Sequence, residues 1–293
     1  MNLNRTSILF LMAVVMPAIL KAQSNSFVGK VIEPSNHNGV PYVSVGIKGK
    51  PFGTIADSTG QFKLFFDPSA IDKSDTIIFT HVGYDAVKKS PAELMAFGNL
   101  IAMQQRSTIL NEVKISPQKE KIEVYGRTPT TITYAPNAYS SIPKISDVSG
   151  REQATILDVD KDILLKQINF MLWSNNYKRL KCRVNFYSVK DDMPDKLISP
   201  EDIIYETQNT HGYKKIDLNK YNIHLKGYKK IAVSIQLIEA DLSPNDVATT
   251  SFLIPAYPLT FRKSYFREKS ESNWVPVKSS YLYINIEAYR VKE

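Results

Sequence analysis

Histidine and cysteine are the residues with which this chain could most readily do catalytic or metal chemistry, and both are scarce. The 293 residues hold one cysteine, Cys182, and four widely separated histidines: His37, His81, His211 and His224. Neither the short spacings that place two histidines on one metal ion nor the Gly-x-Ser-x-Gly turn of serine hydrolases occurs. Cys182 lies in an alternating segment with an apolar face, which predicts a buried thiol and not a nucleophile. We therefore expect no catalytic residues, no metal ligands and no cofactor.

Three aspartates, Asp158, Asp160 and Asp162, repeat at every second position, as ligands do in a calcium-binding EF-hand loop. The sixth loop position would be Ile163 where the loop requires glycine, and the twelfth would be Asn169 where it requires glutamate. We interpret the aspartates as solvated carboxylates at a strand end or turn. Carboxylates that meet from distant strands could still form the acid–base pair of a hydrolase, which is the third of three functional hypotheses.

Exposed aromatic side chains offer a different chemistry, because sugar rings stack on them. A carbohydrate-binding module would use aromatics near strand ends, and the sequence offers five candidates: Trp173, Trp274, Tyr281, Tyr283 and Tyr289. For each of them a covered aromatic at the end of a strand is the favoured explanation. The glycan-binding module is therefore kept as the alternative hypothesis.

The N-terminus has the pattern of a secretory signal peptide at residues 1–22. A polar start with one base, Arg5, precedes the apolar run Ile8–Leu20, and Ala22 is a small residue at the expected cleavage point. The 13-residue run would rise about 20 Å as a helix, too little for a hydrocarbon core of about 30 Å. No later run approaches the length of a transmembrane helix. We expect export to the periplasm, the outer membrane or the extracellular space, without a transmembrane helix in the mature chain.

The formal net charge is +8, but the basic residues are interspersed along the chain. The densest local clusters are Lys88-Lys89, Lys178-Arg179 with Lys181 and Arg183, Lys214-Lys215 and Lys229-Lys230. A nucleic-acid interface would need a concentrated basic patch with stacking aromatics among it. We interpret these bases as solvated strand faces and turns, and expect no nucleic-acid partner.

The elements that would position any site are predicted to be strands. In residues 23–115, short alternating segments such as Val40–Lys48 and Gln61–Phe65 are separated by turn residues every 8–12 positions, which favours a β-sandwich. Ser90-Pro-Ala-Glu93 has the spacing of a capping box and predicts the start of a short helix.

A resemblance follows from the order of motifs in this segment: Gly29-Lys-Val, Gly39-Val-Pro-Tyr-Val-Ser-Val, Gly53-Thr-Ile-Ala-Asp57, Gly60-Gln-Phe62, Asp75-Thr-Ile-Ile-Phe79 and His81-Val-Gly-Tyr84. Residues 26–115 resemble the carboxypeptidase regulatory-like domain, a small prealbumin-like β-sandwich, in the version found as the N-terminal extension of TonB-dependent outer-membrane receptors. The resemblance implies a domain that accompanies enzymes and receptors without doing their chemistry. Leu110-Asn-Glu-Val113 resembles the end of that extension. The rest of the chain lacks the long series of strands that a receptor barrel needs.

Two polar residues of these motifs have a structural interpretation. Asp57 is expected to bond backbone N–H groups across a turn at which Gly60 takes a positive φ. Gly83 is expected to turn the chain before Tyr84, whose ring would cover the end of the sandwich. The alternative is that Asp57 and His81 belong to a functional site.

Residues 116–139 are predicted to be a linker, and residues 140–293 a second domain. Segments 180–188, 229–239 and 280–291 alternate apolar and polar residues over long stretches, which favours a jelly-roll-like sandwich. The second part also loosely resembles jelly-roll modules of exported bacterial proteins. The predicted fold is thus all-β, a small prealbumin-like β-sandwich followed by a larger jelly-roll-like β-sandwich. The favoured function is a non-catalytic exported envelope protein that binds partners, either envelope proteins or a glycan.

Overall fold

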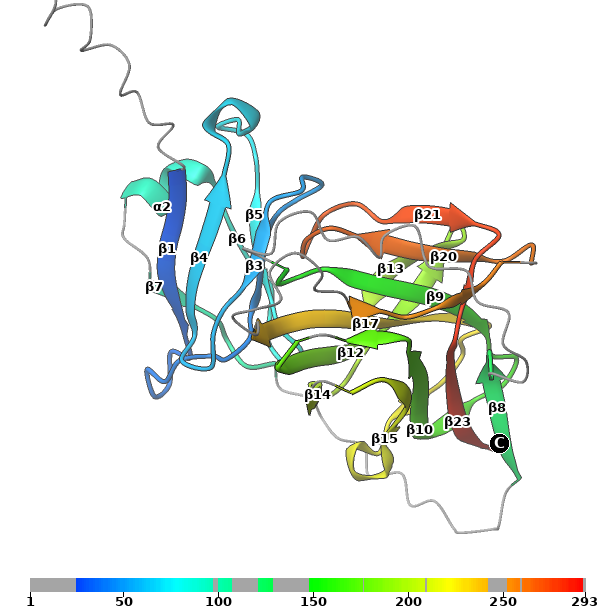
Figure 1. Ribbon diagram of the computed structural model, residues 1–293. Coiled ribbons are helices and arrows are strands. Elements are labelled where there is room, and N and C mark those ends of the chain that lie inside the picture. Colours follow the sequence, from blue (N-terminus) through cyan, green and yellow to red (C-terminus); the bar gives the residue numbers. More distant parts are fainter. Residues whose placement is uncertain are drawn as a thin grey trace, which may run out of the picture.

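The computed structural model describes residues 25–96, 100–106, 121–128, 148–175, 177–208, 210–241, 252–258 and 260–291. Within these ranges the chain forms two β-sandwiches that lie against each other (Figure 1). The all-β prediction, a small sandwich followed by a larger one, is confirmed. The predicted signal peptide at 1–22, the stretch Leu110–Val113, and residues 116–120 and 129–139 of the predicted linker lie outside the described residues.

The N-terminal sandwich consists of a three-stranded and a four-stranded sheet. The first has the order β4-β1-β7 and the second β3-β2-β5-β6. Their strands are β1 (Asn25–Ile32), β2 (Ser44–Ile47), β3 (Gly53–Ile55), β4 (Gln61–Phe66), β5 (Ile77–Thr80), β6 (Val87–Lys89) and β7 (Leu100–Ala102). Strand β4 shows why the sheets stack, since Phe62, Leu64 and Phe66 are buried while the residues between them are exposed.

Local rules explain the connections of this sandwich. The side chain of Asp57 accepts hydrogen bonds from the backbone N–H groups of Thr59 (2.8 Å) and Gln61 (3.0 Å), and Gly60 has φ = 82°. Helix α2 (Pro91–Ala96) begins with the predicted capping box, in which Ser90 and Glu93 bond each other's backbone N–H groups. The predicted turn at Asp57 and the predicted capping box at Ser90 are both confirmed. The hydrogen bonds of Asp57 give it a structural role in the turn.

The C-terminal sandwich contains a seven-stranded and a five-stranded sheet, with antiparallel pairing throughout the described strands. The larger sheet comprises β9 (Glu152–Asp158), β12 (Arg179–Lys190), β13 (Met193–Leu197), β14 (Ile203–Gln208), β17 (Lys230–Asp241), β20 (Lys263–Arg267) and β21 (Val275–Lys278). The smaller sheet comprises β8 (Ile122–Gly126), β10 (Ile163–Leu172), β15 (Gly212–Asp217), β16 (His224–Leu225) and β23 (Ile284–Arg290). Two short ribbons pair β11 (Ser174–Asn175) with β18 (Phe252–Leu253), and β19 (Ala256–Tyr257) with β22 (Tyr281–Leu282).

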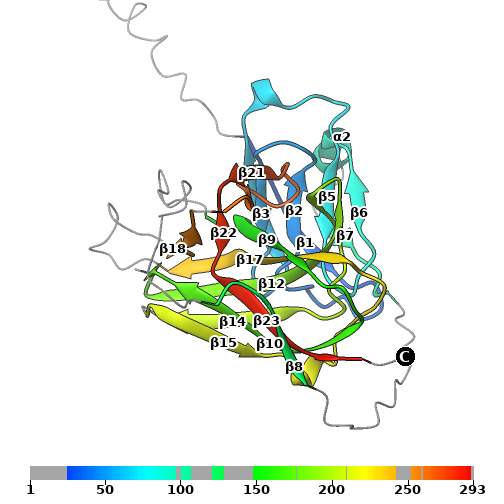
Figure 2. The ribbon, with the colours of Figure 1, turned by 90° about the vertical axis from the view of Figure 1, so that its right-hand side faces the viewer.

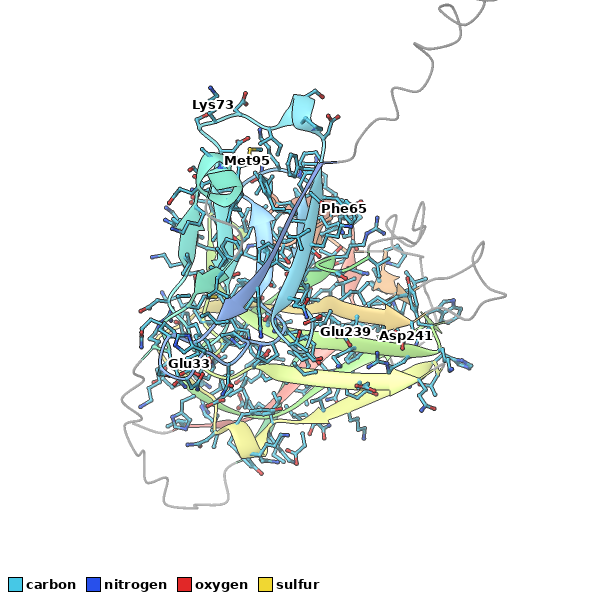
Figure 3. The ribbon with its side chains drawn as sticks, turned by 90° about the vertical axis from the view of Figure 1, so that its left-hand side faces the viewer. Glu33, Phe65, Lys73, Met95, Glu239 and Asp241 are labelled. Atoms are coloured by element: carbon cyan, nitrogen blue, oxygen red, sulfur yellow. The ribbon has the colours of Figure 1, made fainter. Side chains whose placement is uncertain are left out.

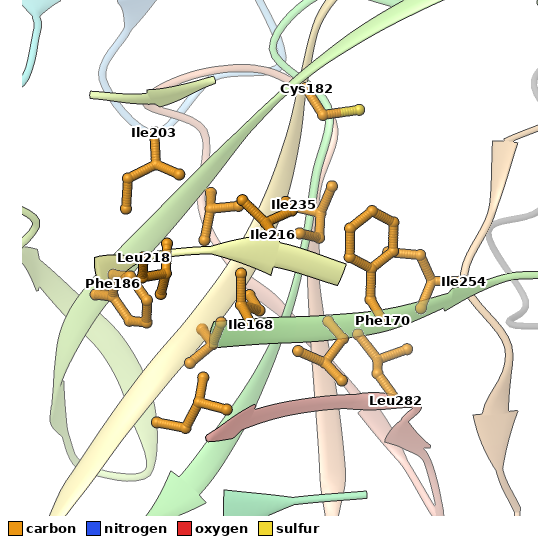
Figure 4. Packing of buried hydrophobic residues seen from close by; sticks show 14 of the residues in the cluster. Ile168, Phe170, Cys182, Phe186, Ile203, Ile216, Leu218, Ile235, Ile254 and Leu282 are labelled. Atoms are coloured by element: carbon orange, nitrogen blue, oxygen red, sulfur yellow. The ribbon is translucent and has the colours of Figure 1, made fainter. Parts of the chain in front are cut away.

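The core of this sandwich lies between its two sheets. Figure 4 shows Cys182 and Phe186 from β12 packed with Ile168 and Phe170 from β10. Cys182 is 1% exposed, as predicted, and burial raises the pKa of its thiol, so the thiol stays protonated and unreactive. The short helices in the described part of the chain are too brief and too polar to cross a lipid bilayer.

Strand β8 lies within residues 116–139, and it pairs antiparallel with β23 of the C-terminal sandwich. The segment assigned to a linker therefore contributes an edge strand to the second domain. We retain 23–115 and 140–293 as the proposed domains, with β8 as an addition to the second. The seven-stranded sheet lies in the middle of the molecule, between the N-terminal sandwich and the five-stranded sheet (Figure 2).

Candidate functional site

The candidate site lies where the N-terminal sandwich covers the outer face of the seven-stranded sheet. Strand β12 alternates, so Leu180, Cys182, Val184 and Phe186 enter the core, and the residues between them point the other way. Arg183 in this outer row is only 3% exposed and donates to the carbonyl oxygen of Tyr42 in the other domain (2.9 Å). The prediction of a solvated Arg183 is wrong, because a second domain covers the face that period-two patterning assigns to solvent.

An arginine, an aspartate and a histidine meet at this boundary. The Arg183 guanidinium donates to both oxygens of Asp202, at 2.6 and 3.0 Å. His81 of the N-terminal domain places Nε2 3.2 Å from Asp202 Oδ2. Burial alone would raise the pKa of Asp202, but the positive charge of Arg183 and the contact with His81 outweigh it, and the pKa lies well below its ordinary value. Asp202 is therefore an anion at neutral pH, placed between the domains.

The other ring nitrogen of His81 determines what Nε2 can do. Nδ1 lies 2.6 Å from the carbonyl oxygen of Val82. Because a carbonyl oxygen only accepts, Nδ1 must carry the proton. Nε2 faces the Asp202 carboxylate, which also only accepts, so the ring is held between two acceptors, one from each domain. His81 therefore joins the two domains at their boundary, a role beyond the fold of its own sandwich.

Two further contacts fix the domains to each other. Lys181 Nζ donates to the Tyr42 hydroxyl (2.6 Å) and to Glu239 (3.0 Å). On the other side, Thr80 Oγ1 donates to Glu271 Oε1 (2.9 Å). The backbone passes so closely there that a Cβ atom on Gly46 would lie 2.1 Å from the carbonyl oxygen of residue 270. A glycine at 46 is thus a requirement of the docking.

A buried carboxylate organises the floor of the site. The side chain of Glu152 is fully buried and forms an ion pair with Arg267, whose Nε donates at 2.7 Å. Asn185 Nδ2 and the Tyr187 hydroxyl each donate to Glu152 Oε1 at 2.9 Å, and the Ser234 hydroxyl donates to the same oxygen. A buried charge is tolerated only with such complete partnering. These strands can therefore carry polar side chains under a second domain.

Two adjoining cavities lie at the boundary, and His81 and Val82 line both. The inner cavity measures about 170 Å³ and its walls include Arg183, Asn185, Tyr187, Asp195, Gln236, Arg267 and Glu271. The outer cleft measures about 680 Å³ and its walls include Glu33, Ser35, Tyr84, Gln104, Gln105, Arg106, Pro200, Glu201 and Asp202. Both domains contribute to both walls, so neither cavity exists without the docking.

The five aromatics considered for glycan binding do not form one platform. Trp173 is 48% exposed after β10, whereas Tyr283 is fully buried. Tyr281 is half-buried, and Arg262 lies over its ring at 5.1 Å. Tyr289 is half-buried at the opposite end of β23, beside Leu164 of β10.

Trp274, the fifth candidate, lies on the other sheet. It contacts the ring of Tyr187 edge-on at 5.7 Å, and the Arg267 guanidinium lies 4.6 Å from its ring. The structure thus places one candidate beside the interdomain site and disperses the rest. In the described part of the chain, no three histidine, cysteine or acidic side chains gather to hold a metal ion.

The residues that build the site were mostly missed from the sequence. Arg183, Asn185 and Tyr187 alternate with core residues, which is the same pattern as a solvated strand face, and Asp202 sits in an unremarkable loop before β14. Two features of the sequence could have indicated the site. The outward-facing row of β12 contains an asparagine and a tyrosine in addition to lysine and arginine, and His81 directly precedes the Val-Gly-Tyr motif.

The comparison with protein families assigns the first sandwich. Residues 27–115 match the CarboxypepD_reg-like domain family. This agrees with the resemblance drawn from the motifs, and the domain is a non-catalytic β-sandwich module. The match ends at residue 115, so it covers the His81 side of the site and none of the Arg183 side. No curated protein matches the chain in sequence.

Proposed function

We propose that this chain is an exported, non-catalytic binding module of the bacterial cell envelope, in the periplasm or at the outer membrane, that receives an envelope protein in its interdomain cleft. The signal-like residues 1–22 support export. The CarboxypepD_reg-like domain, a module type without chemistry of its own, supports binding in place of catalysis. The glycan alternative is less well supported, because its candidate aromatics are dispersed and Tyr283 is buried.

The observation that carries the proposal is the outer cleft of about 680 Å³, which both domains line. Its walls combine polar residues, including Gln104, Gln105 and Glu201, with Val82, Tyr84 and Pro200, whereas small-molecule pockets are lined mostly by apolar side chains. Polar, solvent-accessible loops suit the rim of a protein–protein contact, in which hydrogen bonds fix orientation. The buried Arg183–Asp202 pair beneath keeps the two walls in register.

Export is tested by fractionating cells that express the full chain or a chain lacking residues 2–22. We expect the full chain in the periplasmic or membrane fraction, shortened at its N-terminus, and the truncated chain in the cytoplasm. Equal cytoplasmic retention of both chains would contradict export.

Binding is tested by placing a photo-crosslinking amino acid in the envelope-located protein. Positions 105 and 201 lie in the cleft, and the matched control is exposed Lys73, on the far end of the N-terminal sandwich (Figure 3). We expect a discrete cross-linked species with an envelope protein from the two cleft positions and none from Lys73. Cross-linking that is the same at all three positions, or absent from the cleft, would refute the cleft as the binding surface.

A further inference from the structure

The inner cavity contains a buried hydrogen-bond acceptor that lacks a donor. Asn185 lines this cavity and is 3% exposed. Its Nδ2 donates to Glu152 Oε1, and turning the amide would press its oxygen against that carboxylate, so the orientation is determined by the network. The remaining atom, Oδ1, has no partner among the described residues. A buried acceptor of this kind is costly to leave unpaired, which points to a donor from outside the chain.

His81 lines the same cavity, but its ring already lies between two acceptors, the Val82 carbonyl at Nδ1 and the Asp202 carboxylate at Nε2. The acceptors left for a ligand are therefore Asn185 Oδ1 and the carboxylates of the lining.

The charges around the cavity favour a cation. Its two arginines are already occupied, Arg183 by Asp202 and Arg267 by Glu152. Asp195 and Glu271 also line the cavity, and within the described ranges neither forms an ion pair with a lysine or arginine. When Asp202 and Glu152, which hold the two arginines from behind the wall, are counted, four carboxylates face two guanidinium groups, in a chain whose overall charge is +8. An anionic ligand would meet this excess unfavourably.

We propose that the inner cavity binds a primary ammonium group, as the inner end of the binding site of the proposed function, on which this inference rests. An ammonium offers three N–H donors on a compact charge, which suits several converging acceptors. A metal ion suits them poorly, because the described residues place no three metal-ligating side chains together. The cavity of about 170 Å³ is large enough for an ammonium with a short alkyl chain, since a cavity of only ~10–15 Å³ holds one water molecule.

The ammonium can come from a free amine or from a lysine side chain of a partner protein, and the two sources share this chemistry. A lysine that enters through the outer cleft would pass His81 and Val82, which line both cavities. A free amine needs no contact with the cleft loops. The two sources are therefore separated by comparing n-butylamine with an acetylated and amidated Gly-Lys-Gly peptide.

Trp274 provides the readout, because it contacts Tyr187 and Arg267, both of which line the cavity. The chain has two tryptophans, so Trp173→Phe leaves Trp274 as the single reporter in the otherwise intact protein. We expect saturable fluorescence titrations with n-butylamine, with the peptide, or with both, and no saturation with n-butanol or butyrate. Failure of both amines to saturate, or equal responses to butanol, would overturn the proposal.

Conservative variants locate the site. Asp195→Asn and Glu271→Gln each remove one carboxylate charge from the lining, and we expect each to weaken amine binding about three- to fivefold, as for a partly exposed ion pair. The matched control is Asp72→Asn, which removes an exposed carboxylate from the N-terminal sandwich and should leave affinity unchanged. Equal effects of all three substitutions would show a general charge effect and refute the site.

The two proposals can fail separately. Loss of amine binding together with intact cross-linking from position 201 refutes the ammonium and leaves the binding module standing. Saturable amine binding that depends on Asp195 and Glu271, without any cross-link from the cleft, supports the cavity as an amine site and refutes the protein partner.

Discussion

In the middle of strand β12 both faces are buried, but they are chemically opposite. Leu180, Val184 and Phe186 on the inner face pack against apolar neighbours from the five-stranded sheet. On the outer face, Arg183 and Asn185 are each 3% exposed under the N-terminal domain, and their side chains donate hydrogen bonds to the carboxylates of Asp202 and Glu152. Both faces exclude water, but by different physical means.

The difference teaches how each face resists change. An apolar face needs volume and shape, and neighbouring side chains relax to share a loss. A buried polar face needs a specific partner for every charge, because removing one partner leaves the other charge buried and unpaired. The outer face is therefore expected to depend more strongly on the identity of each side chain than the inner face does. Substitutions on the outer face test whether the N-terminal domain excludes water from it.

The largest effect is expected from Glu152→Ala, which leaves buried Arg267 without its carboxylate. Loss of one member of a buried ion pair costs about 3–5 kcal/mol of unfolding free energy. Phe186→Ala on the inner face is expected to cost the same, about 3–5 kcal/mol, through the cavity it leaves. Urea unfolding of the two variants measures both. Exposed Glu201→Ala is the control and should change the unfolding free energy by less than about 0.5 kcal/mol. A loss below about 1 kcal/mol for Glu152→Ala would show a solvated outer face.

A smaller effect is expected from Arg183→Met at the boundary itself. The variant removes the charge-assisted hydrogen bonds to Asp202 and the bond to the Tyr42 carbonyl, worth about 1.5–3 kcal/mol. Limited proteolysis between the domains should become faster along with the loss of stability, because the contact is lost at the docking surface. The control is Arg179→Met at the end of the same strand, whose exposed pair with Asp241 is worth at most about 1 kcal/mol. Unchanged proteolysis of Arg183→Met would contradict its docking role.

The same comparison shows what the sequence can and cannot predict. Alternation correctly placed Cys182 and Phe186 inside, and turn chemistry correctly placed Asp57, because both rules depend on neighbours along the chain. What covers the outer face depends on Tyr42 and His81, more than 100 positions away from Arg183, and no local pattern encodes that contact. Strand β8 was missed for the same reason, since it is a strand only because β23 pairs with it.

The smallest effect is a dependence on acidity carried by Asp202. Burial would raise its pKa, but Arg183 and His81 lower it below the unfolded value of about 3.9. The stability that Asp202 contributes is therefore fully present above about pH 4 and is lost as the pH falls through the lowered folded pKa. Asp202→Asn, which cannot ionise, should be less stable than the natural chain at pH 7. The gap should narrow below about pH 4, where the unfolded natural chain takes up a proton at Asp202 that the folded chain resists.

Urea midpoints of the two proteins at pH 7, 5, 4 and 3 measure this gap. Asp160→Asn is the matched control, because its side chain is 74% exposed, and its midpoints should run parallel to those of the natural chain. A constant gap for Asp202→Asn across the series would mean that the charge of Asp202 does not hold the domains together. The outer face of β12 would then be stabilised by packing, as the inner face is, and the two faces would not differ in how they exclude water.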